Sequence, residues 1–225
     1  MIMAAAVAAP KVLMIGDSIS IGYHHAVYAS LPNAIVVRPG ENCRSTAYAV
    51  GRIQDWLLDT HWDAVHFNFG LHDIWQSIPA GPHLVEIDEY AANLETIVGA
   101  IRPMATEIVF ATTTPVPDGT PNRSNDDVLE YNLIAVQLME HLGVRVDDLY
   151  RFVAESPDAH LWQREHDAHF TPAGFAALGD NVAQCIGFRL AEQNPPNMPV
   201  ANIPALACAF ALTGIAALLL TGRQP

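Results

Sequence analysis

The stretch KVLMIGDSISIGYHH, residues 11–25, carries the first indication of the fold. Its apolar first part, Lys11–Ile15, ends directly in the tripeptide GDS, after which the sequence follows a helical period. A short apolar strand that runs almost without a loop into a helix is typical of the repeating unit of a parallel sheet. Ser18 or Ser20 can cap such a helix, and a serine at this turn can also be a nucleophile, so two interpretations stay open.

The same alternation of strand and helix continues along the chain. Short apolar runs predict strands at Lys11–Ile15, Ala34–Val37, Ala64–Phe69, Glu107–Ala111 and Val144–Val146. Segments of helical period lie near Ser20–Ser30, Ser45–Asp59, Ile87–Ile101, Asn125–Leu142 and Thr171–Ala191. Near-continuous apolar strands separated by helices imply a parallel sheet that is covered on both faces. We therefore expect an α/β protein with a three-layer, flavodoxin-like, doubly wound fold around a five-stranded parallel sheet.

Composition excludes one class of partner. The chain has 225 residues, of which 51% are hydrophobic, and a formal net charge of -13. Its 24 acidic residues stand against 10 arginines and a single lysine, Lys11. Nucleic-acid binding needs clustered cations, so we expect no nucleic-acid partner. No oligomeric state is predicted.

We expect the three cysteines to be thiols rather than disulfides or metal ligands. Cys43, Cys185 and Cys208 are an odd number, and their spacings match no zinc site and no disulfide framework. They give no indication of an oxidising compartment.

The two ends of the chain differ from the predicted domain, 11–192. Residues 1–10 form an apolar extension without the basic residue that a secretory signal needs. Residues 193–202 are typical of a linker, and 203–221 form an apolar tail. Its uncharged 18 residues, Ile203–Leu220, would span about 27 Å as a helix, against a bilayer core of about 30 Å.

This tail is a candidate transmembrane segment. If it is an anchor, the absence of an N-terminal signal would leave the domain on the cytosolic side of a membrane. The alternative is an interfacial helix or a loosely packed apolar tail.

Polar side chains gather in the segments that follow the predicted strands. These segments are GDSIS at 16–20, RPGENCRST at 38–46 and NFGLHDIW at 68–75, and REHDAHFTPAGF at 164–175 precedes the last helix. Ligands of doubly wound sheets bind beyond the carboxyl ends of the strands, so these groups are candidates for one site. The sequence contains neither a GxGxxG fingerprint nor a P-loop.

The chain resembles the SGNH hydrolases, also called GDSL esterases and lipases, over about 180 residues. Three blocks in order carry the resemblance: GDSIS at 16–20, GLHD at 70–73 where the family usually has GxND, and HFTPAG at 169–174. The resemblance implies that Ser18 attacks an acyl carbonyl and forms an acyl-enzyme, with His169 as the base. Such a site needs no cofactor and no metal.

The third member of the catalytic triad departs from the family pattern. The family places an aspartate three residues before the histidine, where this chain has His166. Asp167, two residues before His169, is our candidate to orient the imidazole and stabilise its charged form. Glu165 is an alternative, as is a backbone carbonyl that serves a Ser-His dyad.

The predicted oxyanion hole consists of Ser18, Cys43 and His72. His72 replaces the family's asparagine, and a neutral imidazole still carries one N–H donor. The family's second donor is the backbone N–H of a glycine two residues before a serine or threonine, a position that Cys43 occupies here; Gly40 is the alternative. We expect the neighbouring Asp73 to brace this loop rather than to react.

The resemblance predicts a small-molecule acyl ester as substrate, with acylated carbohydrates preferred. Two other functions stay open: a metal-dependent hydrolase, suggested by His160 and by HDAH at 166–169, and a membrane-tethered binding module that has lost the reaction. The metal hypothesis lacks an HExxH motif and a second Cys/His cluster. Trp75 is a candidate to stack on a sugar ring or to close the edge of the core.

Overall fold

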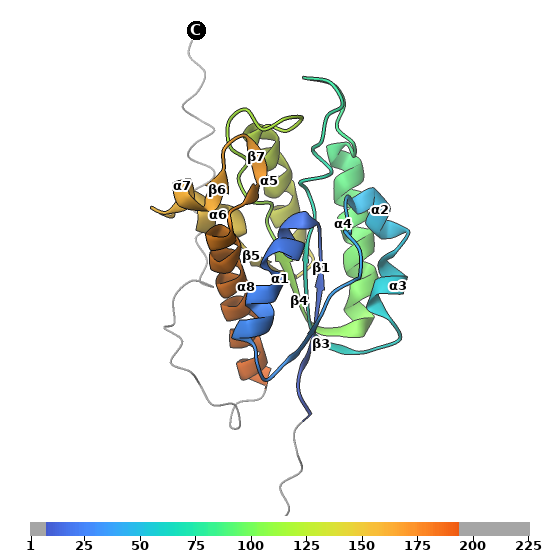
Figure 1. Ribbon diagram of the computed structural model, residues 1–225. Helices are drawn as coiled ribbons and strands as arrows, with labels where there is room; N and C mark the ends of the chain where they lie inside the picture. Colours follow the sequence, from blue (N-terminus) through green and yellow to red (C-terminus); the bar gives the residue numbers. More distant parts are fainter. Residues whose placement is uncertain (1–7, 194–225) are drawn as a thin grey trace, which may run out of the picture.

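The computed structural model describes residues 8–193, and it contains the predicted five-stranded parallel sheet (Figure 1). The strand order is β2-β1-β3-β4-β5, which is the flavodoxin-like order. The predicted fold class is confirmed. The strands are β1 Lys11–Ile15, β2 Ile35–Val37, β3 Trp62–Asn68, β4 Ala105–Ala111 and β5 Arg145–Asp147.

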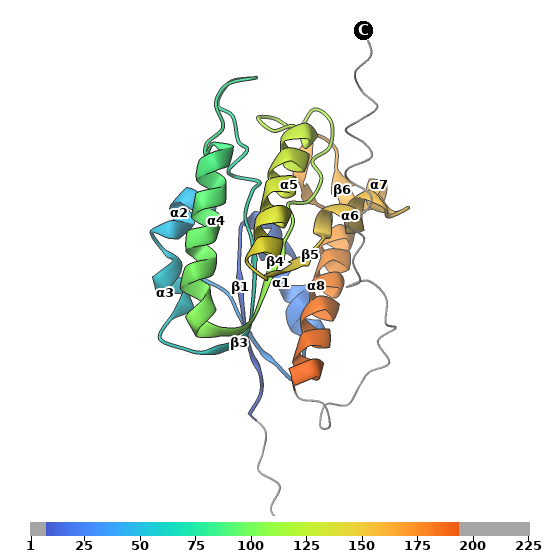
Figure 2. The same cartoon turned by 180° about the vertical axis from the view of Figure 1, so that it is seen from behind.

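Helices cover both faces of the sheet, as Figures 1 and 2 show. One face carries α1 and α8, which lie side by side; the other carries α4 and α5, with α2 and α3 beside α4. The long helices are α1 Ser18–Ser30, α4 Ile87–Ile101, α5 Asn125–His141 and α8 Pro172–Gln193. The short helices are α2 Thr46–Val50, α3 Ile53–Leu57, η1 Arg102–Met104, α6 Leu149–Ala154 and α7 Ala159–Trp162.

The strands consist almost entirely of apolar residues because they are buried in the core. In β1 the four residues from Val12 to Ile15 are all buried, and in β3 the last five are. The helix α4 buries a stripe with helical spacing, made of Tyr90, Leu94, Ile97, Val98 and Ile101. Both faces of the sheet are therefore removed from water, as the sequence predicts.

A buried polar contact fixes α8 to the sheet. Asp147, at the end of β5, accepts a hydrogen bond from Asn181 Nδ2 of α8 at 3.0 Å. The other carboxylate oxygen of Asp147 lies 3.1 Å from His66 Nε2 in β3. This contact holds the middle of α8 at the carboxyl end of β5.

The helix predicted at Ser45–Asp59 is divided into α2 and α3. Gly51 ends α2, and the chain turns before α3 begins at Ile53. Donors from α2, from α3 and from the residue before α3 reach one carboxylate across this break: Glu41 accepts from Tyr48 Oη, Trp56 Nε1 and Arg52 Nη2. Tertiary contacts thus override the helical period here.

A short antiparallel hairpin, β6 Gln163–Arg164 and β7 Asp167–Phe170, precedes α8. No pattern in the sequence predicts this hairpin, because strands of two and four residues are too short to show a period. Its position next to α1 brings the last block of the sequence to the first.

The predicted tail lies outside the described residues, and so do most of the linker and residues 1–7. Within residues 8–193, no helix is both long and apolar enough to cross a bilayer.

Candidate active site

Ser18 is the first residue of α1, and Asp17 caps the helix. The Asp17 carboxylate accepts a hydrogen bond from the Ile19 N–H at 2.9 Å. Neither Ser18 nor Ser20 is therefore the cap. The capping role falls to the aspartate, which leaves the Ser18 hydroxyl free for another partner.

The turn that presents Ser18 requires glycine at position 16. A Cβ on Gly16 would lie 1.9 Å from Asn68 Oδ1 and 2.9 Å from Ser20 Cβ, so a larger residue would displace these side chains. The Asn68 Nδ2 group donates to Asp17 Oδ1 at 3.1 Å. The end of β3 thus holds the cap of α1 in place.

Ser18, His169 and Asp167 form one hydrogen-bonded chain. Ser18 Oγ lies 2.9 Å from His169 Nε2, and His169 Nδ1 lies 2.7 Å from Asp167 Oδ1. A carboxylate only accepts hydrogen bonds, so Nδ1 carries the proton and Nε2 can accept from the serine hydroxyl. This arrangement can take a proton from Ser18 and hold it on the imidazole.

The geometry of β7 explains how an aspartate only two residues before the histidine can contact the histidine ring. Side chains at i and i+2 of a strand point to the same side, and the burial of β7 alternates accordingly. Asp167 and His169 therefore face the same way, while Ala168 and Phe170 are buried. The Asp167 carboxylate also accepts the backbone N–H of His169 at 3.0 Å.

The surroundings of Asp167 favour its charged form. Partial burial raises its pKa, but hydrogen bonds from the His169 ring and backbone, with the charges of His169 and Arg164, together hold the pKa below its usual value. The alternative Glu165 lies 3.5 Å from His166 and is 89% exposed. His166 itself hydrogen-bonds the Asp118 carbonyl. Of the acidic candidates near His169, Asp167 is thus the one in contact with its ring.

Asp73 braces the loop after β3, as expected. It is fully buried and accepts hydrogen bonds from the backbone N–H of Thr46, at 2.8 Å, and from the Thr46 hydroxyl. Burial raises the pKa of Asp73 to about 7, against the effect of these hydrogen bonds. Asp73 thereby ties the GLHD block to the start of α2.

His72, the residue before it, is half-buried and lies within electrostatic reach of His169. Burial lowers the pKa of His72 against the negative charge of Asp17, and the charges of Arg123, Arg44 and His169 lower it further. Its ring is therefore neutral at pH 7 and carries a single N–H donor. Along the chain from 8 to 193, no side chain or backbone group hydrogen-bonds this ring.

The Cys43 backbone amide already has a partner. It donates to the Gly16 carbonyl at 3.1 Å, and the side chain is wholly buried. Burial raises the pKa of the Cys43 thiol to about 12, so the thiol is protonated at neutral pH. Gly40, the alternative, is exposed. An oxyanion at Cys43 would have to share the amide with Gly16.

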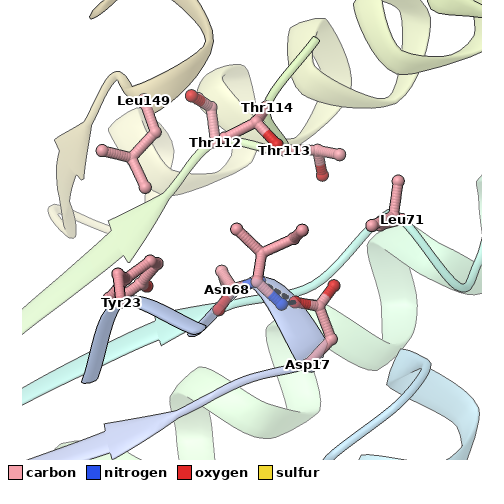
Figure 3. A pocket seen from close by; sticks show the side chains of 9 residues that line it. Asp17, Tyr23, Asn68, Leu71, Thr112, Thr113, Thr114 and Leu149 are labelled. Carbon is pink, nitrogen blue, oxygen red and sulfur yellow. Dashed lines mark hydrogen bonds between the residues drawn. The ribbon is translucent and has the colours of Figure 1, made fainter. Parts of the chain in front are cut away.

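A small cavity of about 10 Å³ lies beside Asp17, the residue that caps α1 (Figure 3). Its lining includes Asp17, Tyr23, Asn68 and Thr112–Thr114. Four buried atoms of these side chains make no hydrogen bond within the described residues: Asp17 Oδ2, Tyr23 Oη, Asn68 Oδ1 and Thr114 Oγ1. A polar cavity of this size has room for about one water molecule.

Asn68 begins the polar segment 68–75, and Thr112–Thr114 begin the turn-rich segment 112–126, which the sequence predicts to wall the pocket. The sequence assigns no supporting role to these side chains. The signal was nevertheless present, because Asn68 ends β3 and the threonines directly follow β4. Both positions lie at the carboxyl edge of the sheet, where ligands bind in this fold.

The metal alternative finds no ligand cluster in the described part of the chain. No group of three or more His, Cys, Asp or Glu side chains within it is placed to hold a metal ion. His160 and His166 instead hydrogen-bond the carbonyls of Pro157 and Asp118.

Comparison with known protein families gives a match over most of the domain. The model of the GDSL-like lipase/acylhydrolase family matches residues 14–177. A curated relative, a GDSL esterase/lipase of Arabidopsis thaliana, is 26% identical over 136 residues, covering 51% of this chain and 54% of the relative. The chain thus spans about half the length of that relative.

Several solved structures share the fold. A lipase/acylhydrolase from Enterococcus faecalis has a TM-score of 0.70 at 21% identity, over 80% of this chain and 96% of its own. The acetyl xylan esterase AlAXEase has a TM-score of 0.67 at 17% identity, over 78% and 99%. The acetylxylan esterase Axe2 from Geobacillus stearothermophilus has a TM-score of 0.61 at 19% identity, over 81% and 97%. The matched blocks and the shared architecture lead to one conclusion: the chain belongs to the GDSL-like lipase/acylhydrolase family.

Proposed function

We propose that this protein is a serine esterase that hydrolyses small acyl esters through an acyl-enzyme on Ser18. The observation that carries the proposal is the contact of Ser18 Oγ with His169 Nε2 at 2.9 Å, continued to Asp167 at 2.7 Å. A serine hydroxyl is a weak nucleophile until a base takes its proton, and this contact supplies the base.

The reaction has two halves. His169 takes the proton of Ser18 as Oγ bonds to the acyl carbon, and the imidazolium then protonates the departing alcohol as the ester C–O bond breaks. Water attacks the acyl-enzyme in the second half, with His169 again as base, and the carboxylic acid leaves. Asp167 stabilises the imidazolium in both halves.

The Ser18 amide and the His72 ring are the proposed donors to the oxyanion. The Ser18 N–H belongs to the first turn of α1, where backbone donors lack an intrahelical acceptor. The His72 ring makes no hydrogen bond within residues 8–193, and the charge of His169 acts on it, so its N–H is available to an oxyanion. The site is in this respect a variant, with GLHD in place of GxND. Cys43 is the third candidate, provided that its amide is shared with Gly16.

We infer a short acyl group, with an acylated carbohydrate as the alcohol. Two acetylxylan esterases are among the proteins that share the fold, and one similar structure is a catalytic mutant of Axe2 with a serine-to-alanine substitution. The open position of the base also fits a short acyl group, since the His169 side chain is 42% exposed.

The test is hydrolysis of a chain-length series of nitrophenyl esters by the full chain, Ser18→Ala and Ser20→Ala. Ser20 is a matched control because it lies on the same helix turn and its hydroxyl has no hydrogen-bond partner in the structure. We expect turnover of short esters by the full chain and Ser20→Ala only. Full turnover by Ser18→Ala would contradict the nucleophile, and peak activity at ten or more acyl carbons would contradict the substrate.

A further inference from the structure

A second cavity, of about 290 Å³, opens between two loops beyond the sheet. One loop follows the GLHD block and contributes Gln76; the other precedes α5 and contributes Thr120, Asn122 and Arg123. The loops are joined at Gln76, whose N–H donates to the Asn122 carbonyl at 2.9 Å and whose carbonyl accepts from Asn122 Nδ2 at 2.6 Å. The cavity therefore has a fixed wall.

Arg123 connects this cavity to the active site. Its Nε donates to the Leu71 carbonyl at 2.6 Å, and Leu71 immediately precedes His72. The charge of Arg123 lowers the pKa of His72, while the charges of Asp17 and Asp167 act on Arg123 in turn. The guanidinium thus lies within electrostatic reach of the reacting groups.

The two terminal nitrogens of Arg123 have no acceptor within residues 8–193. The arginine ion pairs among residues 8–193 are those of Arg52, Arg151 and Arg164. The Nε contact with Leu71 is the sole hydrogen bond of the Arg123 side chain in this part of the chain. These nitrogens are not among the buried atoms without a partner, so they reach solvent and can donate to a bound molecule.

The other polar side chains that line the cavity already make hydrogen bonds within the protein. The Thr120 hydroxyl donates to the Pro117 carbonyl at 2.7 Å, and the Gln76 side-chain amide contacts His83 at 3.0 Å. The amide of Asn122 serves Gln76. Arg123 is therefore the strongest donor that the cavity can offer to a bound molecule.

We propose that this cavity is a substrate subsite in which Arg123 binds an anionic group, a carboxylate, carried by the ester. The inference rests on the proposed function and deepens it. The planar fork of a guanidinium matches a carboxylate through two parallel hydrogen bonds. An apolar acyl chain in the same place would bury the charge without an acceptor, so the subsite also selects against long acyl groups.

Two matched pairs of esters test the subsite and show which side of the ester it takes. The alcohol-side pair is 4-acetoxybenzoate and its methyl ester; the acyl-side pair is phenyl hydrogen glutarate and its methyl ester. The readout is the kcat/KM of the anionic ester divided by the kcat/KM of the neutral ester. Any effect of a substitution on the reaction itself acts on both esters and cancels in this ratio. The proteins are the full chain, Arg123→Gln and the control Arg151→Gln, which removes an exposed arginine paired with Glu155.

We expect Arg123→Gln to lower this ratio about 10- to 100-fold in one pair, as a charge-assisted hydrogen-bonded pair implies. Arg151→Gln should leave both ratios unchanged. Equal ratios in the full chain and Arg123→Gln, for both pairs, would overturn the subsite. If neutral esters are still cleaved in a Ser18-dependent way, the proposed function survives that outcome.

A binding measurement removes the dependence on turnover. Calorimetry with the products 4-hydroxybenzoate and glutarate should show weaker binding of one of them to Arg123→Gln, and an unchanged melting temperature checks that the variant is folded. Equal affinities of both proteins for both products would also contradict the proposal.

Discussion

Ser18 Oγ and His169 Nε2 lie 2.9 Å apart although 151 positions separate the two residues in the sequence. The contact depends on two helices that pack side by side on one face of the sheet (Figure 1). Ser18 begins α1, and the strand that carries His169 leads directly into α8. The packing of α1 against α8 therefore sets the geometry of the site.

Gly179 in α8 is required for this packing. A Cβ there would lie 2.4 Å from Ala26 Cβ and 2.8 Å from the Tyr23 carbonyl of α1. We expect Gly179→Ala to lower the free energy of unfolding by about 1–3 kcal/mol. Gly99→Ala in α4 is the control, because a Cβ there meets nothing within 4 Å. It should raise stability by about 0.5–1 kcal/mol. Urea denaturation measures both, and a Gly179→Ala protein as stable as the parent would contradict the packing argument.

Asp167→Asn should slow turnover by about three orders of magnitude or more, because an amide can present its N–H to His169 Nδ1 and favour the wrong tautomer. Steady-state and single-turnover kinetics with a short ester measure the effect. Glu165→Gln is the control, since Glu165 contacts His166 rather than His169. A nearly unchanged rate for Asp167→Asn would exclude Asp167 from the triad.

His72→Ala should lower kcat by about 100- to 1000-fold, the typical cost of removing one oxyanion donor. His72→Asn restores an N–H donor of the kind the family uses, so it should recover most of this loss. Both variants remove the imidazole ring, but only His72→Asn keeps an N–H donor. The comparison therefore separates the loss of the hydrogen bond to the oxyanion from a change in the structure of the loop. Equal activities of the alanine and asparagine variants would argue against a donor role.

The buried carboxyl of Asp73 predicts a pH-dependent stability. Burial raises its pKa from 3.8 to about 7, so the folded protein binds a proton that the unfolded chain releases. This contribution to stability is complete below about pH 4 and is lost as the pH rises through about 7. Relative to Asp73→Asn, the parent should therefore lose about 1–3 kcal/mol between pH 5 and pH 8. Urea unfolding at both pH values checks this, and a constant difference between the two proteins would contradict it.

The sheet and the long helices could be predicted because their residues are buried in regular patterns. Ile87–Ile101 has the predicted bounds, since its apolar stripe alone determines the buried face. The division of α2 from α3 could not be predicted, because it depends on contacts with Glu41, which lies outside both helices.

The candidate site shows the same distinction between local pattern and tertiary contact. The resemblance to the family points to Ser18 and His169, and the structure brings their side chains into contact. The hairpin that aligns Asp167 with His169 is too short to show a period. The hydrogen bond from the Cys43 amide to Gly16 joins two segments far apart in sequence, so no local pattern indicates it.

The most direct test of the central claim is to locate the acyl group during turnover. The full chain is mixed with a short nitrophenyl ester, quenched in acid within the first turnover, digested and sequenced by mass spectrometry. We expect an acyl adduct on Ser18 that accumulates in the burst and is absent from Ser18→Ala. Continued hydrolysis with no adduct on Ser18, or with the adduct on another residue, would contradict it.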